Sequence, residues 1–327
     1  MATSHAAVWQ RATVLDTTAL TDDIRRIVLA PDHPATVDAG AHIDVRVPIG
    51  GVPDRRSYSV VDDGPDGRTL AISVLDSPRS RGGARAMHAL RPGDTIEITQ
   101  PIVDFPLRVG AAHYVLLAGG IGITAVMGMA RVLRSVRADY TLVYAGRSRP
   151  ALAYLEQLQS AHGDRLRLHI SDEGTPLDVI ELVGGVEPGT ELYLCGPIRL
   201  MDAVRRAWIE RELPYPDLRF ETFGNSGWFA PEDFVVRIPR IGAEVTVRAT
   251  ETMLEALEAA EVDLMFDCRK GECGLCEVRV LDLDGDIDHR DVFYSERQKD
   301  SRGAMCCCVS RAVAPPGGTA VVSIDIS

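Results

Sequence analysis

The stretch CRKGECGLC, residues 268–276, decides how the C-terminal part of this chain folds. Its spacing, C-x4-C-x2-C with more cysteine about thirty residues later, is that of plant-type ferredoxin loops. A 2Fe–2S cluster needs four thiolates that converge on a small inorganic core, and a tight loop supplies three of them. Gly271 and Gly274 would let the backbone approach and donate N–H groups to the sulfurs. The spacing therefore predicts Cys268, Cys273 and Cys276 as cluster ligands.

The same cysteines have two other interpretations. A zinc site usually pairs two C-x2-C knuckles, whereas only one end of this loop has that spacing. Buried structural cysteines are the second alternative. Six of the seven cysteines lie in the last 60 residues, which in a reducing cytosol indicates a metal site rather than disulfides. The fourth thiolate would come from the run Cys306-Cys307-Cys308, and bare spacing, with 29 residues after Cys276, favours Cys306.

Length and charge restrict the class of protein. At about 100–200 residues per domain, 327 residues predict two or three domains. A net charge of −12 repels phosphate backbones, so we expect no nucleic-acid partner. The sequence has no run of about 18 apolar residues, so it predicts no membrane span, and the N-terminal residues lack signal-peptide features. We therefore expect a cytoplasmic protein without a membrane partner.

Three segments differ in pattern. Residues 1–109 contain short alternating runs such as HIDVRVPI (42–49) and LAISVL (70–75), bounded by turn residues, which predict a small antiparallel β-barrel with one helix at 83–90. In residues 110–224, apolar strands such as YVLLAGG (114–120) alternate with helical stretches at 125–135, 152–162 and 201–212, which predicts an α/β domain with a parallel sheet.

The third segment, residues 234–327, follows a linker at 225–233. It begins with a predicted strand pair at 234–238 and 244–249. Thr252 and Glu255 then form a T-x-x-E capping box ahead of a helix at 253–260. The cysteine loop follows that helix, and LDLDGD (281–286) reads as a turn.

Three strand ends of the α/β segment carry candidate nucleotide-binding residues. Gly119, Gly120 and Gly122 would let a pyrophosphate approach the N–H groups at a helix start, although such a turn is equally often only a tight connection. Cys195-Gly196-Pro197 ends a second strand, and a lone cysteine is most often a buried structural residue. Ser171-Asp172-Glu173 ends a third, where an acidic group would hold ribose hydroxyls and disfavour a 2′-phosphate, or would only form a solvated loop.

Two short motifs in the barrel suit a phosphate and an aromatic ring. In Arg56-Ser57-Tyr58-Ser59, an arginine can neutralise a phosphate and a tyrosine can stack on a ring, but four residues alone are a weak signal. Arg81-Gly82-Gly83-Ala84, at the start of the predicted helix, is a second phosphate cradle.

Taken together, these motifs resemble the phthalate dioxygenase reductase and vanillate demethylase reductase family over essentially the whole chain. RSYS matches the family's R-x-Y-S flavin motif, and RGGA its glycine turn for the FMN phosphate. GGIGIT and YLCGP match its two nicotinamide motifs. The resemblance implies the domain order FMN barrel (1–109), NAD domain (110–224) and 2Fe–2S ferredoxin domain of the β-grasp type (234–327).

The resemblance also implies roles for single residues. Thr124 and Cys195 would flank the site of hydride transfer, and Cys308, in the ending Cys-Val-Ser-Arg-Ala, would be the fourth cluster ligand, with the extra residues placed in LDLDGD. The implied FMN contacts are Arg56, Ser57, Tyr58, Ser59, Ser73, Val74, Leu75, Gly82, Gly83, Ala84 and Phe223. The implied NAD contacts are Gly119, Gly120, Gly122, Thr124, Arg147, Asp172, Cys195, Gly196 and Pro197. The chain departs from the family at Ala125, usually proline, and at Leu75, often basic.

These modules together predict an NADH-dependent oxidoreductase, because a flavin converts the two electrons of a hydride into the single electrons that an iron–sulfur cluster accepts. FMN is favoured over FAD by the resemblance. The sequence shows no Rieske C-x-H pair and no haem cysteine motif, so a separate partner would do the substrate chemistry. We expect a monomeric reductase for a terminal oxygenase, first a Rieske-type aromatic oxygenase and second a haem monooxygenase. A non-enzymatic iron–sulfur carrier or sensor is a further alternative.

Overall fold

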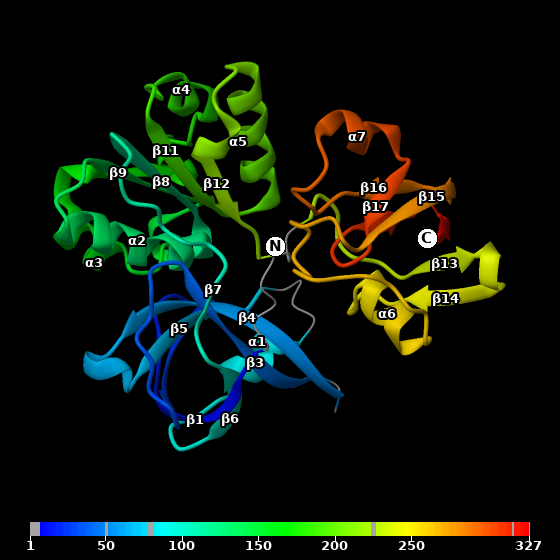
Figure 1. Cartoon of the computed structure of the whole chain (residues 1–327), viewed down its shortest axis with the longest axis horizontal. Helices are drawn as coiled ribbons and strands as arrows, with labels where there is room; N and C mark the ends of the chain where they lie inside the picture. Colours follow the sequence, from blue (N-terminus) through cyan, green and yellow to red (C-terminus); the bar gives the residue numbers. More distant parts are fainter. Residues whose placement is uncertain (1–6, 50–51, 78–81, 224–226, 316, 327) are drawn as a thin grey trace. The chain divides into compact units, whose positions relative to one another are not determined.

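A computed structural model of the chain describes residues 7–49, 52–77, 82–223, 227–315 and 317–326. These residues group into two compact units. The first holds most of the chain up to Glu221, and the second holds Thr222 onward together with Pro197–Asp202. Each unit is described by itself, and Figure 1 gives the labels of the elements.

The first unit begins with an antiparallel β-barrel. Its strands follow the order β4-β5-β2-β1-β6-β3-β7, and a further pairing of β4 with β3 closes the sheet. Side chains alternate in and out along the strands, so that Val14, Ile27, Ile43 and Ile72 fill the interior. The strands are β1 (Trp9–Ala19), β2 (Ile24–Pro31), β3 (Ala41–Ile49), β4 (Val52–Asp63), β5 (Leu70–Leu75), β6 (Thr95–Thr99) and β7 (Ile102–Val103). The predicted helix at 83–90 is α1 (Gly83–His88).

A five-stranded sheet follows in the same unit. Its strands run in the order β10-β9-β8-β11-β12, and every pairing is parallel. The strands are β8 (His113–Gly119), β9 (Tyr140–Gly146), β10 (Leu166–Ile170), β11 (Thr190–Cys195) and β12 (Leu218–Glu221). The helices are α2 (Ile123–Ser135), α3 (Leu155–His162), α4 (Val179–Gly184) and α5 (Ile198–Glu210). In Figure 1, α2 and α3 lie on one side of the sheet, and α4 and α5 lie on the other. Because both faces are covered, the central strands are apolar throughout, as the sequence predicted.

The second unit contains a mixed sheet in the order β14-β13-β19-β15-β17 and a small separate pair, β16 with β18. Among the described residues of this unit, only β13 and β19 pair in parallel, and the other strands pair antiparallel. The strands are β13 (Phe234–Ile238), β14 (Ala243–Val247), β15 (Glu277–Asp284), β16 (Asp286–Asp288), β17 (Ala304–Cys306), β18 (Arg311–Val313) and β19 (Ala320–Asp325), and the helices are α6 (Met253–Ala259) and α7 (Glu296–Ser301).

Helix α6 packs Leu254 and Leu257 into the core of this unit. Its start has the predicted capping box: the Thr252 hydroxyl accepts the Glu255 N–H at 3.1 Å, and the Thr252 N–H donates to the Glu255 carboxylate at 2.7 Å.

The barrel, the parallel sheet and the ferredoxin-type sheet confirm the predicted fold class. The prediction of a turn at 281–286 was wrong, because pairing with β19 continues to Asp284. The register shifts between Val280 and Asp282, so a β-bulge accommodates one of the two extra residues, and the turn falls at Gly285. Helix α4 was not predicted. The boundaries at 109–110 and 224–225 remain predictions.

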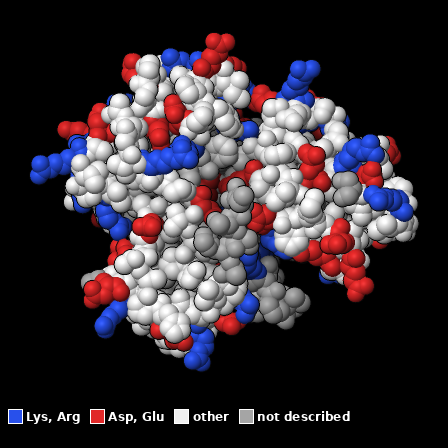
Figure 2. All heavy atoms as spheres, viewed as in Figure 1, with Lys and Arg blue, Asp and Glu red and all other residues white. Residues whose placement is uncertain are grey.

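Several surface charges are paired locally. On the face drawn in Figure 2, acidic and basic side chains are interspersed over most of the surface. Arg46 meets Glu97 at 2.9 Å and Arg237 meets Glu244 at 2.8 Å, and all four side chains are largely exposed. Pairs of this kind contribute little to stability. Among the described residues, none of the helices has the length and apolar character needed to cross a membrane.

Candidate functional site

The glycine-rich turn brings two strand ends together in the first unit. Strand β8 ends at Gly119, a short 3-10 turn spans Gly120–Gly122, and α2 begins at Ile123. A Cβ on Gly122 would lie 2.2 Å from the Cys195 carbonyl oxygen at the end of β11, a distance that no side chain tolerates. Gly120 has φ +54°, in the left-handed region that favours glycine. Both glycines are therefore required by the backbone path, and the predicted nucleotide motif has a structural reason.

The two residues predicted at the hydride-transfer site lie next to this close contact between Gly122 and the end of β11. Cys195 pairs with Ala118 in the parallel register and is fully buried. Thr124 lies in the first turn of α2, and its hydroxyl donates to the Ile121 carbonyl at 2.9 Å. No side chain caps the start of α2, and the Ile123 N–H donates back to the carbonyls of Gly120 and Ile121 in the preceding 3-10 turn. The structure thus brings together the turn at 119–124 and the strand end at 195–196.

The third and fourth strand ends lie beside each other at the same edge. The Asp172 N–H donates to the Arg147 carbonyl at 2.9 Å, and both side chains are exposed. The next acidic residue, Glu173, holds Arg149 through two bonds of 2.7 and 2.9 Å. Sequence reasoning missed this pair, although both residues adjoin predicted ones. The pair neutralises Arg149, whereas no ion pair of Arg147 is observed within the described residues.

The barrel motif divides between the two faces of β4. Ser57 and Ser59 lie on one face of β4, where they pair across the strands with Asp44 and His42 of β3. Tyr58 lies on the other face and packs towards the barrel core. The Ser57 hydroxyl donates to the buried Asp44 carboxylate at 2.5 Å, so it supports the barrel. The Ser59 hydroxyl is buried and has no hydrogen-bond partner within the described part of the chain.

An unpartnered buried hydroxyl is costly unless something else bonds to it. The Ser59 hydroxyl therefore fits a hydrogen bond to a polar group of a ligand, such as a flavin edge. Arg56 on the same strand donates to the Arg55 carbonyl at 2.8 Å, and its side chain is half-buried.

The remaining predicted flavin contacts have different surroundings. The Ser73 hydroxyl bonds to the hydroxyl of Tyr154 at 2.5 Å, a contact that the sequence did not predict. Burial raises the pKa of Tyr154, and the Ser73 bond partly offsets that shift. The Val74 side chain lies in the barrel core and its carbonyl faces the His88 ring at 2.8 Å, so a ligand would reach only its backbone.

The predicted phosphate cradle begins at Gly82, which has φ +107° and caps α1. Gly83 is buried and Ala84 packs against the barrel core. Leu75 and Phe223 are half-buried. Arg81 lies outside the described residues.

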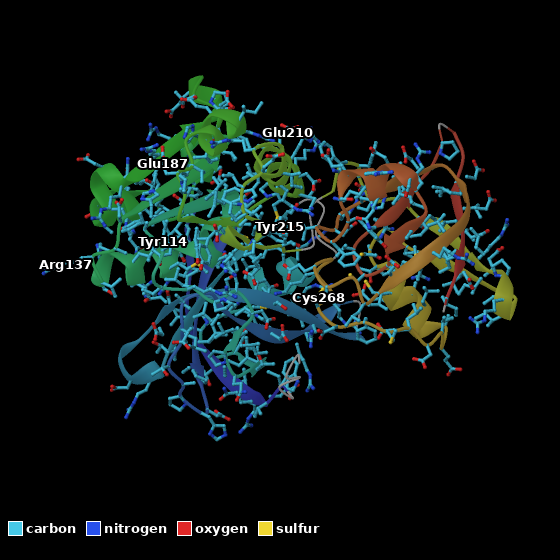
Figure 3. All side chains as sticks on the ribbon, turned by 45° about the horizontal axis from the view of Figure 1, so that its top comes forward. Tyr114, Arg137, Glu187, Glu210, Tyr215 and Cys268 are labelled. Atoms are coloured by element: carbon cyan, nitrogen blue, oxygen red, sulfur yellow. The ribbon has the colours of Figure 1, made fainter. Side chains whose placement is uncertain are left out.

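The cysteine loop of the second unit lies between α6 and β15, where Figure 3 labels Cys268. Backbone N–H groups of Lys270 and Glu272 each donate to the Cys268 sulfur at 3.4 Å. Gly271 and Gly274 both have φ +76°. A Cβ on Gly271 would lie 2.6 Å from Val309, and one on Gly274 would lie 2.3 Å from the Phe293 ring. Glycine is therefore required at both positions, and the peptide N–H groups surround sulfur as an anionic cluster needs.

The thiols of the loop meet those of the later cysteines. The Cys308 thiol bonds to that of Cys268 and lowers the pKa of Cys268 to about 5. It bonds to Cys276 as well, and thiol bonds from Cys306, Cys307 and Cys308 lower the pKa of Cys276. Burial raises the pKa of the more exposed Cys273, which also contacts Cys268.

The donor set fits a two-iron cluster better than a single ion. No group of three or more His, Cys, Asp or Glu side chains within the described ranges is arranged to hold one metal ion. A 2Fe–2S cluster divides its four thiolates between two irons, so three need not converge on one point. The residues present thus fit the cluster that the spacing predicted.

Comparison with known proteins agrees with this arrangement. Residues 236–313 match the Fer2 family, described as 2Fe-2S iron-sulfur cluster binding domain. Phenoxybenzoate dioxygenase subunit beta of Ectopseudomonas oleovorans is 39% identical over 283 residues, which cover 85% of this chain and 86% of that protein. Vanillate O-demethylase oxidoreductase of Pseudomonas sp. (strain HR199 / DSM 7063) is 35% identical, covering 84% and 87%. The solved structure of phthalate dioxygenase reductase superposes with a TM-score of 0.73 at 29% identity, covering 97% of this chain and 98% of that one.

The chain belongs to the phthalate dioxygenase reductase and vanillate demethylase reductase family. This membership confirms the predictions of an oxidoreductase that uses a flavin, NADH and a 2Fe–2S cluster, and of a reductase component in an oxygenase system. The assignment of single residues to these cofactors stays a prediction.

Proposed function

We propose that this member of the family takes hydride from NADH at an FMN in the barrel and passes single electrons through its own cluster to a Rieske-type aromatic oxygenase. The observation that carries the proposal is the combination, in one chain, of the uncapped glycine turn beside Cys195 with four thiols meeting at the cysteine loop. The flavin, when bound, supplies the change from two-electron to one-electron chemistry, which neither nucleotide nor cluster supplies alone.

In this proposal the turn at 119–124 binds the dinucleotide. The N–H groups at the start of α2 hold the pyrophosphate, and the absence of a side chain at Gly122 keeps Thr124 and Cys195 beside each other. Asp172 at the neighbouring edge holds the adenosine ribose and repels a 2′-phosphate, while Glu173 keeps Arg149 occupied. These residues favour NADH over NADPH.

The flavin-side residues orient the second cofactor. The Ser59 hydroxyl, buried without a partner in the described structure, donates to the polar edge of the ring, and Arg56 neutralises the phosphate. Gly82, Gly83 and Ala84 supply backbone beside the phosphate, and FMN rather than FAD is proposed from the family resemblance. The other implied contacts, Tyr58, Leu75 and Phe223, would border the ring.

For the cluster we propose Cys268, Cys273, Cys276 and Cys308 as the four ligands. Among the three consecutive cysteines, Cys308 bonds to the thiols of both Cys268 and Cys276. Spacing alone favoured Cys306, whose position at the end of β17 places it opposite Glu277, within the sheet. The domains 1–109, 110–224 and 234–327 would carry FMN, NAD and cluster in turn.

The partner is proposed from relatives and from the chain's own content. The relatives' names refer to a phenoxybenzoate dioxygenase, a vanillate O-demethylase and a phthalate dioxygenase, all of which act on aromatic compounds. We propose a monomeric, cytoplasmic reductase whose oxygenase is a separate protein. A haem monooxygenase is the second candidate partner.

The test begins with the visible spectrum of the purified protein before and after anaerobic NADH. Flavin and iron–sulfur bands that both bleach support the internal electron path, whereas flavin bands alone in a protein with reconstituted iron and sulfide would refute the cluster. Cys273→Ser should abolish cluster-dependent cytochrome reduction and spare flavin reduction. Turnover with a purified Rieske oxygenase, compared with a haem monooxygenase at equal concentration, distinguishes the two partners.

A further inference from the structure

Two buried cysteines beside the cluster loop have no part in the ligand set proposed above. Cys306 and Cys307 directly precede Cys308, and both are fully buried. They share one core with Cys276 in the second unit. A cluster needs only one thiolate from this run, so two thiols remain without a role.

The backbone fixes both residues next to Cys276. Cys306 is the last residue of β17, and it pairs with Glu277, the residue after Cys276. The Cys307 N–H donates to the Cys276 carbonyl at 3.1 Å, and the Cys307 carbonyl accepts the N–H of Leu254 in α6 at 2.9 Å. Cys307 is therefore fixed on one side by the cysteine loop and on the other by a helix. The thiols of Cys306 and Cys307 both lie close enough to that of Cys276 to interact with it.

We propose that Cys306 and Cys307 are positioning residues that donate S–H hydrogen bonds to the sulfur of Cys276 and so raise the reduction potential of the cluster. The proposal rests on the function proposed above, in which Cys276 is a ligand. Reduction adds negative charge to the ligand sulfurs, so a donor bond stabilises the reduced cluster more than the oxidised one. A second thiolate in the same buried place would instead add a like charge, which is unfavourable. Thiols are weak donors, so each contributes a modest shift.

The test compares Cys306→Ala, Cys307→Ala, Cys306→Ser and Cys307→Ser in the full-length protein. The midpoint of cluster reduction is measured by an anaerobic redox titration followed by the electron paramagnetic resonance of the reduced cluster. We expect each alanine variant to have a more negative midpoint than the parent protein. Each serine variant, which is of similar size and keeps a donor, should have a midpoint at or above the parent value. A purely structural role would shift alanine and serine variants in the same direction.

The outcomes separate this inference from the proposed function. If the parent protein, after reconstitution, lacks the iron and sulfide of a 2Fe–2S cluster, the proposed function is wrong. If the cluster forms but the alanine variants keep the parent midpoint, or alanine and serine variants shift alike, the tuning role is overturned. If the alanine variants hold no cluster while the serine variants hold it at the parent midpoint, the result supports hydrogen bonding. If all four variants fail to hold a cluster, the thiols serve cluster assembly, and the proposal is overturned.

Discussion

Replacing Gly122 with alanine places one methyl group where two strand ends meet. The added Cβ would lie 2.2 Å from the Cys195 carbonyl oxygen, 2.5 Å from its carbon and 2.9 Å from the Gly196 nitrogen. All three atoms belong to backbone, so no side chain can rotate away. The ends of β8 and β11 must then separate by about 1 Å, and overpacking of this kind costs about 1–3 kcal/mol. A displacement of about 1 Å at a reacting centre can lower a rate about 100-fold.

We therefore expect Gly122→Ala to reduce its flavin about 100-fold more slowly than the parent at the same NADH concentration. Stopped-flow absorbance under anaerobic conditions measures this rate. The matched control is Gly128→Ala on α2, whose added Cβ would lie no closer than 3.8 Å to its neighbours. The control should keep the parent rate and stabilise the helix by up to about 1 kcal/mol. A Gly122→Ala protein that reduces its flavin at the parent rate, with flavin and cluster retained, would refute the reasoning.

Four further outcomes are expected. Cys308→Ser should lose the parent electron paramagnetic resonance signal of the cluster with flavin content unchanged, since Cys308 contacts two loop thiols; an unaltered signal would exclude it as a ligand. Asp172→Ala should narrow the preference for NADH over NADPH, measured as the ratio of the two kcat/KM values, and an unchanged ratio would remove Asp172 from specificity. Burial, together with Arg134 and Arg165, lowers the pKa of His162 below 6.5. The unfolded chain therefore binds a proton that the folded chain does not, so the free energy of unfolding should fall as pH drops below 6.5, and His162→Gln should flatten that slope in urea titrations. Thr252→Ala should cost about 1 kcal/mol of stability through the lost helix cap, measured as a lower unfolding midpoint of the ferredoxin-type unit.

Local sequence signals predicted the helices and strands named above. The features that these signals missed depend on contacts between residues far apart in the sequence. The capping box at Thr252 and the turn glycines act over a few residues, so their spacing was readable. The Ser73–Tyr154 bond joins residues 81 positions apart, and no local pattern indicates it. LDLDGD has turn-forming residues, yet pairing with β19 overrides that local preference and absorbs one of the two extra residues in a bulge.

The fourth ligand of the cluster could not be chosen from local sequence signals either. Counting residues from Cys276 favoured Cys306, because spacing carries no information on which thiol of a consecutive run faces the loop. In the structure β17 ends at Cys306, and the chain then turns, which places Cys308 beside Cys268 and Cys276.

The strand order of the second unit has a consequence for biosynthesis. Strand β19 lies in the middle of the sheet, between β13 and β15, yet the ribosome makes it after every other strand of that sheet. All six cysteines of this unit emerge before it. Since chains lengthen by about 5–20 residues per second, the thiols are exposed for a few seconds before the central strand can insert. Iron–sulfur delivery to the nascent chain would therefore meet an unfinished sheet, and stable loading must wait for the last strand to pair.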